Sequence, residues 1–188
     1  MEIPAETTEN SLNVLSFGAG AIGTYIGGSL ALHGNRVIFL ERPEVAEELS
    51  LRGLQLTIAG QTHAIPRPLV VGSLAEALEM APLDVALFAL KSFDTRPALK
   101  SVASLVERFP PVLCLQNGVE NEAALADVLG PERVIAGTVT SAIGRRTAGN
   151  ILLERLRGIG VAAGHPLSER LVAALNQAGL NAYLVAGG

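Results

Sequence analysis

Residues 12–36, LNVLSFGAGAIGTYIGGSLALHGNR, contain the stretch that decides the fold. The apolar run at 12–17 stops at a glycine, which predicts a short buried strand. Residues 21–32 have helical spacing and end before Gly34, a residue typical of a helix C-cap. Between these two segments lies a G-x-G-x-x-G turn, Gly18-Ala19-Gly20-Ala21-Ile22-Gly23. A strand directly before this turn and a helix directly after it form the context in which the motif binds a dinucleotide.

Each glycine of the turn meets a separate physical requirement. Gly18 permits the tight turn, Gly20 lets a pyrophosphate approach the backbone, and Gly23 lets the helix pack closely on the strand. The N–H groups and the positive dipole end of the helix would face the phosphates. A packing turn without a ligand is the less favoured alternative in this context. We therefore expect the whole turn to bind the cofactor: Gly18, Ala19, Gly20, Ala21, Ile22 and Gly23.

Strand and helix signals alternate along the first two thirds of the chain. Apolar runs predict further strands at 36–40, 84–90 and 112–115. Capped or amphipathic segments predict helices at 43–51, 73–80, 97–108 and 121–129. Such alternation is typical of right-handed βαβ units and a parallel sheet.

The remaining segments predict additions to this core. We expect a hairpin at 54–58 and 63–65, a long strand at 133–142, a second hairpin at 149–156 and 159–163, a helix at 166–178 and a strand at 180–185. The fold class is therefore α/β: a Rossmann-like, doubly wound, mostly parallel sheet with helices on both faces and an antiparallel C-terminal extension.

The composition excludes several classes of protein. Hydrophobic residues make up 49% of the 188 residues and charged residues 17%, which excludes a disordered chain. A formal charge of −4 provides no basic field for nucleic acid or an anionic membrane. Cys114 is the single cysteine, and the histidines are scattered, so we expect neither disulfides nor a metal site. Glycines interrupt the uncharged stretch 10–35, which argues against a membrane span, and we expect a cytoplasmic protein.

Cofactor choice depends on the residues that follow the second strand. Glu41 could accept hydrogen bonds from a ribose 2′-OH and would repel a 2′-phosphate, whereas Arg42 favours the phosphate. Spacing alone leaves both possibilities open.

Lys91 and Asn117 follow two other predicted strands, at the edge of the sheet where ligands bind in α/β proteins. A surface lysine and an Asn-Gly turn are the alternatives.

Taken together, these motifs resemble those of the ketopantoate reductase (2-dehydropantoate 2-reductase) family. The resemblance covers residues 12–185 and rests on GAGAIG at 18–23, ER at 41–42, LRGLQL at 51–56, ALKSFDT at 89–95, QNGVENE at 116–122 and a glycine-bearing segment at 137–149. It implies that the turn holds a pyrophosphate and that Arg42 meets the 2′-phosphate of NADP. It also implies that Lys91 and Asn117 line the nicotinamide end of the cleft. Glu41 departs from the family pattern, so NAD is kept as a second cofactor.

The resemblance also sets expectations for domains and activity. We expect a flexible tail at 1–11 and an NAD(P)-binding Rossmann domain at 12–188. Family members carry a further helical domain that supplies the proton donor, so we expect no catalytic residue in this chain. The implied reaction is NADPH-dependent reduction of ketopantoate, a small 2-keto acid, in pantothenate and coenzyme A biosynthesis.

Several alternatives to this reading stay open. They are reduction of another 2-keto acid, a non-catalytic NAD(P)-sensing module, and an interaction subunit that binds no nucleotide. A homodimer also stays open.

Overall fold

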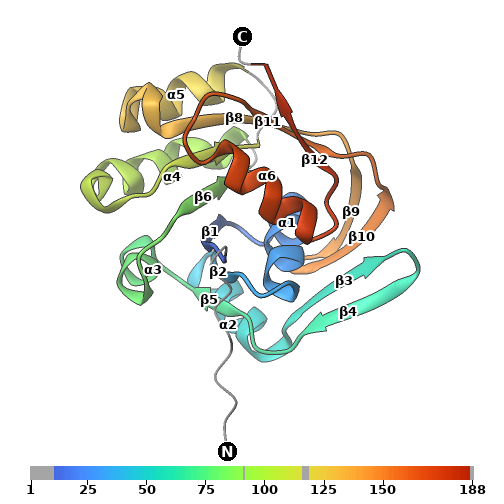
Figure 1. Cartoon of the computed structure of the whole chain (residues 1–188). Helices are drawn as coiled ribbons and strands as arrows, with labels where there is room; N and C mark the ends of the chain where they lie inside the picture. Colours follow the sequence, from blue (N-terminus) through green and yellow to red (C-terminus); the bar gives the residue numbers. More distant parts are fainter. Residues whose placement is uncertain (1–10, 91, 116–118, 187–188) are drawn as a thin grey trace, which may run out of the picture.

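The computed structural model describes residues 11–90, 92–115 and 119–186, without the side chains of 92–94 and 119. Two sheets and six α-helices form these parts of the chain (Figure 1). Lys91, Asn117 and all of the expected tail except Ser11 lie outside the described residues.

The larger sheet has eight strands and carries the glycine turn at its centre. Its strands, in order across the sheet, are β12 (Ala182–Val185), β11 (Ile159–Ala162), β8 (Val134–Val139), β7 (Val112–Cys114), β6 (Val85–Phe88), β1 (Asn13–Phe17), β2 (Arg36–Leu40) and β5 (Leu69–Val71). Neighbours from β8 to β5 pair in parallel, whereas β11 runs antiparallel to β8. The expected parallel sheet with an antiparallel C-terminal extension is confirmed.

Helices cover both faces of the eight-stranded sheet, as predicted. They are α1 (Ala21–Leu32), α2 (Pro43–Arg52), α3 (Leu74–Met80), α4 (Ser92–Ala103), α5 (Val119–Leu129) and α6 (Ser168–Gln177). Val14 of β1 belongs to the core cluster that includes α1 and α6, and the adjacent Leu15 belongs to the cluster that includes α3, α4 and α5. Successive strand residues thus point to opposite faces, and both faces are buried, which explains the continuous apolar runs of these strands.

The smaller sheet packs on the outer side of α1. It has the order β4 (Gln61–Ile65), β3 (Leu54–Ile58), β10 (Asn150–Arg155) and β9 (Ala142–Thr147). A Cβ on Gly27 would lie 2.9 Å from the Phe39 ring in β2, and one on Gly28 would lie 2.8 Å from Leu56 in β3. Two adjacent glycines therefore let α1, the blue helix below α6 in Figure 1, fit closely between the two sheets.

The expected long strand at 133–142 is wrong, and so is the hairpin at 149–163. The chain leaves the larger sheet after β8 and enters the smaller one at β9, and it returns between β10 and β11. β10 pairs with β9 and β3, whereas β11 pairs with β8 and β12. Ser141 links the β8–β9 connection to the β10–β11 connection, because its Oγ accepts hydrogen bonds from the backbone N–H groups of Arg157 and Gly158 at 3.0 and 3.1 Å.

Other boundaries differ less from expectation. The helix predicted at 97–108 begins at Ser92 and ends at Ala103, so Pro97 lies inside α4 and not at its start. The short strand β5 carries no strong sequence signal and was not predicted. Ser73 caps α3 as predicted, since its Oγ accepts a hydrogen bond from the Glu76 N–H at 3.3 Å. Among the described residues, no helix has the length and apolar character needed to cross a membrane.

Candidate cofactor site

The first glycine of the turn directs the chain from β1 into α1. Gly18 has φ +87°, a conformation that favours glycine. Its N–H donates to the Leu40 carbonyl at the end of β2 (2.8 Å), and its own carbonyl accepts a hydrogen bond from Ser16 Oγ (3.0 Å). The turn is therefore tied to the carboxyl ends of β1 and β2, at the edge of the sheet where α/β proteins bind ligands.

The second glycine leaves open space at the start of α1. Gly20 is the N-cap of the helix, no side chain caps it, and the first turn carries no acidic residue. A Cβ built on Gly20 would meet no atom within 4 Å. Because the first N–H groups of a helix have no partner within the helix, this opening fits an anion such as a pyrophosphate. Ala21 and Ile22, which form the first turn beside it, are half-buried.

The third glycine brings α1 against β1. A Cβ on Gly23 would lie 2.9 Å from Ser16 Oγ and would also collide with the Gly18 carbonyl. Ser16 is a contributor that the motif does not reveal, because its role appears only once β1 and α1 are packed together.

The turn is also fastened to the smaller sheet. The carbonyl of Ala19 accepts a hydrogen bond from the N–H of Gly149, in the turn between β9 and β10, at 2.9 Å. Ala19 itself is fully buried. No local sequence signal could predict this contact, because the two residues are far apart in the chain and belong to different sheets.

The side chains of Glu41 and Arg42 have different contacts. Glu41 Oε1 accepts a hydrogen bond from the Ala19 N–H at 2.6 Å, and its Oε2 accepts one from the Arg42 N–H at 3.3 Å. The Arg42 guanidinium lies 3.6 Å from the Glu44 carboxylate, and its side chain is 76% exposed. Glu41 therefore contacts the glycine turn, whereas the Arg42 side chain lies on the surface beside α2.

Lys91 and Asn117 stay predictions, since neither residue is described. Their segments follow β6, which pairs with β1, and β7, which lies on the other side of β6. Leu90, which precedes Lys91, has its Cδ2 3.4 Å from the position of a Cβ on Gly18. The topology thus brings the segment before Lys91 to the glycine turn, at the same edge as the end of β7.

Other candidate sites among the described residues are weaker. A cavity of about 390 Å³ lies near the start of α6 and is lined by Gly164, His165, Ser168 and Leu184, among others. It follows β11, which is antiparallel to β8, so it lies at the sheet edge opposite the glycine turn. Within the described ranges no three His, Cys, Asp or Glu side chains are grouped to hold a metal.

A central parallel sheet, a glycine turn after its first strand and an open helix N-terminus define a dinucleotide-binding domain of the Rossmann type. Sequence comparison gives the family. Residues 14–164 match the family described as "Ketopantoate reductase PanE/ApbA", and the chain belongs to it.

Individual relatives agree with this assignment. The chain is 32% identical over 175 residues to 2-dehydropantoate 2-reductase of Pyrococcus horikoshii, covering 90% of this chain and 54% of the relative. The crystal structure of 2-dehydropantoate 2-reductase from Geobacter metallireducens is similar with a TM-score of 0.75 and 30% identity, covering 92% of this chain and 57% of that one. A third structure, D-mandelate dehydrogenase with NADH and anilino(oxo)acetate, shares the fold with a TM-score of 0.75 and 24% identity, covering 92% and 56%. The chain spans about half the length of the curated relatives that it matches.

Proposed function

We propose that this chain is the cofactor-binding part of an NAD(P)H-dependent reductase whose substrate is the 2-keto acid ketopantoate. The observation that carries the proposal is the open position at Gly20, next to the uncapped N-terminus of α1. The names of the relatives, 2-dehydropantoate 2-reductases, support the substrate. We further propose that the protein works in the cytoplasm on small molecules.

Different residues would bind different parts of the cofactor. The backbone of the turn, Gly18, Ala19, Gly20, Ala21, Ile22 and Gly23, would hold the pyrophosphate through N–H groups. The resemblance assigns the 2′-phosphate of NADP to Arg42, and the nicotinamide end to Lys91 and Asn117. A reduced dinucleotide bound in this way supplies a hydride to the keto carbon of the substrate.

The chain's own residues would bind and orient the cofactor without completing the reaction. Reduction of a ketone needs a substrate held beside the hydride donor and an acid that protonates the developing alkoxide. We place both in the part of the enzyme that the relatives have and that this chain does not span. A non-catalytic NAD(P)-sensing module is the second candidate, favoured by the same partial coverage.

Calorimetry and a turnover assay test the proposal together. The folded chain is expected to bind NADH or NADPH and to leave the absorbance of the reduced nicotinamide unchanged when ketopantoate is added. Supplying the second half of a related reductase, fused after Gly188, should give turnover. A folded chain that binds neither dinucleotide at millimolar concentration would refute the proposal. Binding without turnover in the fusion would favour the sensing module.

A further inference from the structure

The Glu41 side chain is held in place by backbone N–H groups on both sides. Its Oε1 accepts the Ala19 N–H at 2.6 Å and its Oε2 accepts the Arg42 N–H at 3.3 Å. Bonds from N–H donors to a charged carboxylate are stronger than those between neutral groups. The carboxylate is therefore a fixed part of the glycine turn.

This carboxylate lies where the adenosine ribose of a dinucleotide would come. Oε1 is 3.7 Å from the position of a Cβ on Gly18, and the residue that it contacts, Ala19, adjoins the open space at Gly20. In Rossmann domains the ribose follows the pyrophosphate toward the end of the second strand. A carboxylate has about four acceptor positions, so two N–H contacts leave room for a ribose 2′-OH to donate.

The surroundings of Arg42 do not favour a 2′-phosphate. Its guanidinium lies beside Glu44, and both side chains are mostly exposed, at 76% and 67%. Such a surface pair is weak, so Arg42 is able to turn toward a ligand. Even then, residues 41–44, which connect β2 to α2, carry one cation, Arg42, against two carboxylates, Glu41 and Glu44. A phosphate group with its own negative charge would meet a junction that is already net negative.

We infer that Glu41 makes NAD(H), and not NADP(H), the preferred cofactor of this chain. The inference rests on the proposed dinucleotide function and deepens it. It departs from the NADP expectation that the resemblance places on Arg42. The alternative is that Glu41 only stabilises the turn, in which case neutralising it would change both affinities equally.

The test is calorimetric titration of the 188-residue chain with NADH and NADPH. ADP-ribose and its 2′-phosphate serve as a second pair that lacks the nicotinamide. We expect wild type to bind the ligand without the 2′-phosphate about tenfold more tightly in each pair, the size of one charge-assisted hydrogen bond. Glu41→Gln keeps an acceptor for Ala19 and should remove most of this preference, because the neutral amide makes a weaker bond to the ribose 2′-OH and does not repel a 2′-phosphate.

Glu48→Gln is the matched control, because it makes the same charge change on α2 at a residue that pairs with Arg52. It should leave the ratio of affinities unchanged. Glu44→Gln provides a second variant away from the turn, and it should tighten NADPH binding without weakening NADH binding. A wild-type preference for NADPH, equal affinities, or a ratio unchanged in Glu41→Gln would overturn the inference while leaving the proposed function intact. Failure of the folded chain to bind any of the four ligands would overturn both.

Discussion

Ser16 and Gly23 meet at the point where β1 and α1 come closest. Ser16 Oγ lies 2.9 Å from the position that a Cβ on Gly23 would occupy, and it donates a hydrogen bond to the Gly18 carbonyl at 3.0 Å. The same small space thus contains the hydroxyl that stabilises the turn and the bare α-carbon that lets the helix approach. Substitutions at Gly23 and Gly20 should therefore have opposite consequences.

Gly23→Ala should destabilise the fold. The added methyl group would overlap the Gly18 carbonyl, a backbone atom, and would press on Ser16 Oγ. Overpacking of this kind costs about 1–3 kcal/mol. Urea unfolding followed by circular dichroism measures the loss. A variant as stable as wild type would show that α1 can shift away from β1 without cost.

Gly20→Ala should keep the fold and lose the ligand. Gly20 has φ −73°, which alanine adopts easily, and its Cβ would point into open space. The change in the free energy of unfolding should stay within about 1 kcal/mol, as expected for an N-cap. Dinucleotide binding, measured by calorimetry, should fall more than tenfold because the methyl group blocks approach to the backbone. Unchanged affinity would place the pyrophosphate elsewhere.

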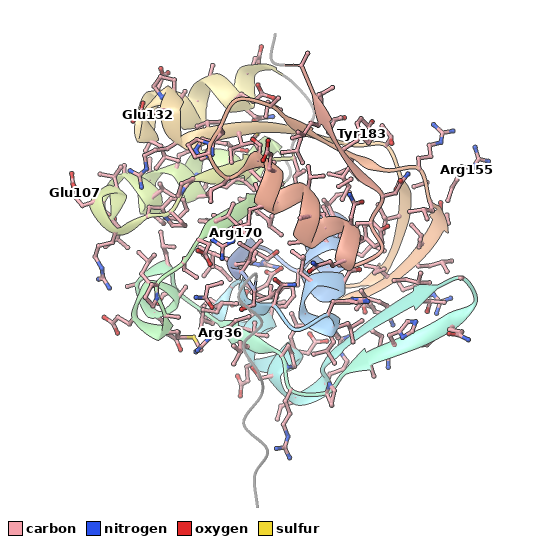
Figure 2. The ribbon with its side chains drawn as sticks, viewed as in Figure 1. Arg36, Glu107, Glu132, Arg155, Arg170 and Tyr183 are labelled. Carbon is pink, nitrogen blue, oxygen red and sulfur yellow. The ribbon has the colours of Figure 1, made fainter. Side chains whose placement is uncertain are left out.

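Asp84→Ala should weaken the contact between α6 and the start of β1. The Asp84 carboxylate accepts from the Arg170 guanidinium at 3.1 Å and from the Asn13 N–H at 2.7 Å, and Arg170 also donates to the Ser11 carbonyl at 2.9 Å. Figure 2 shows Arg170 between α6 and the central strands. The unmade bonds should cost about 1–3 kcal/mol.

The control for this variant is Glu48→Ala, which removes an exposed helical pair with Arg52. That pair should contribute about 0.3–0.5 kcal/mol. Thermal unfolding of both variants gives the comparison. Equal losses would show that the Asp84–Arg170 contact contributes no more than a surface ion pair.

Tyr25 should make the protein sensitive to alkali. Burial raises the pKa of its phenol above 10.0, and the Ser141 hydroxyl opposes part of that rise. Above pH 10 the unfolded chain loses this proton while the folded chain keeps it, so the free energy of unfolding falls as the pH rises, by at most about 1.4 kcal/mol per pH unit. Tyr25→Phe should flatten the pH dependence in urea unfolding.

The local part of the fold was predictable from the sequence. β2, α1 and β3 have the expected bounds, because Gly34 separates α1 from the apolar run of β2 and Gly53 separates α2 from that of β3. The family and the mostly parallel sheet followed from that alternation and from the motifs.

Features that depend on distant partners were not predictable. No glycine or proline separates β8 from β9 at Thr140-Ser141, so the two strands form one continuous signal. Their different pairing partners, and the bonds from Arg157 and Gly158 to Ser141, become visible only in the folded chain. Pro97 resembles the first residue of a helix, which concealed the earlier start of α4. At the site, Glu41 and Arg42 are neighbours in the sequence, so the sequence does not show which of them contacts the glycine turn. The Glu41 hydrogen bond to Ala19 and the Arg42 ion pair with Glu44 show that it is Glu41.

The position of Cys114 gives the molecule a built-in reporter of its own opening. Cys114 is the single cysteine, and it lies fully buried in β7, between the two central strands β6 and β8. Its side chain belongs to the core cluster that α3, α4 and α5 cover, so a thiol reagent can reach the sulfur only when this layer of helices lifts from the sheet or the core unfolds. The rate of alkylation of the wild-type chain therefore measures how often this core opens, and its slowing by a nucleotide would measure how strongly the ligand stabilises the closed state.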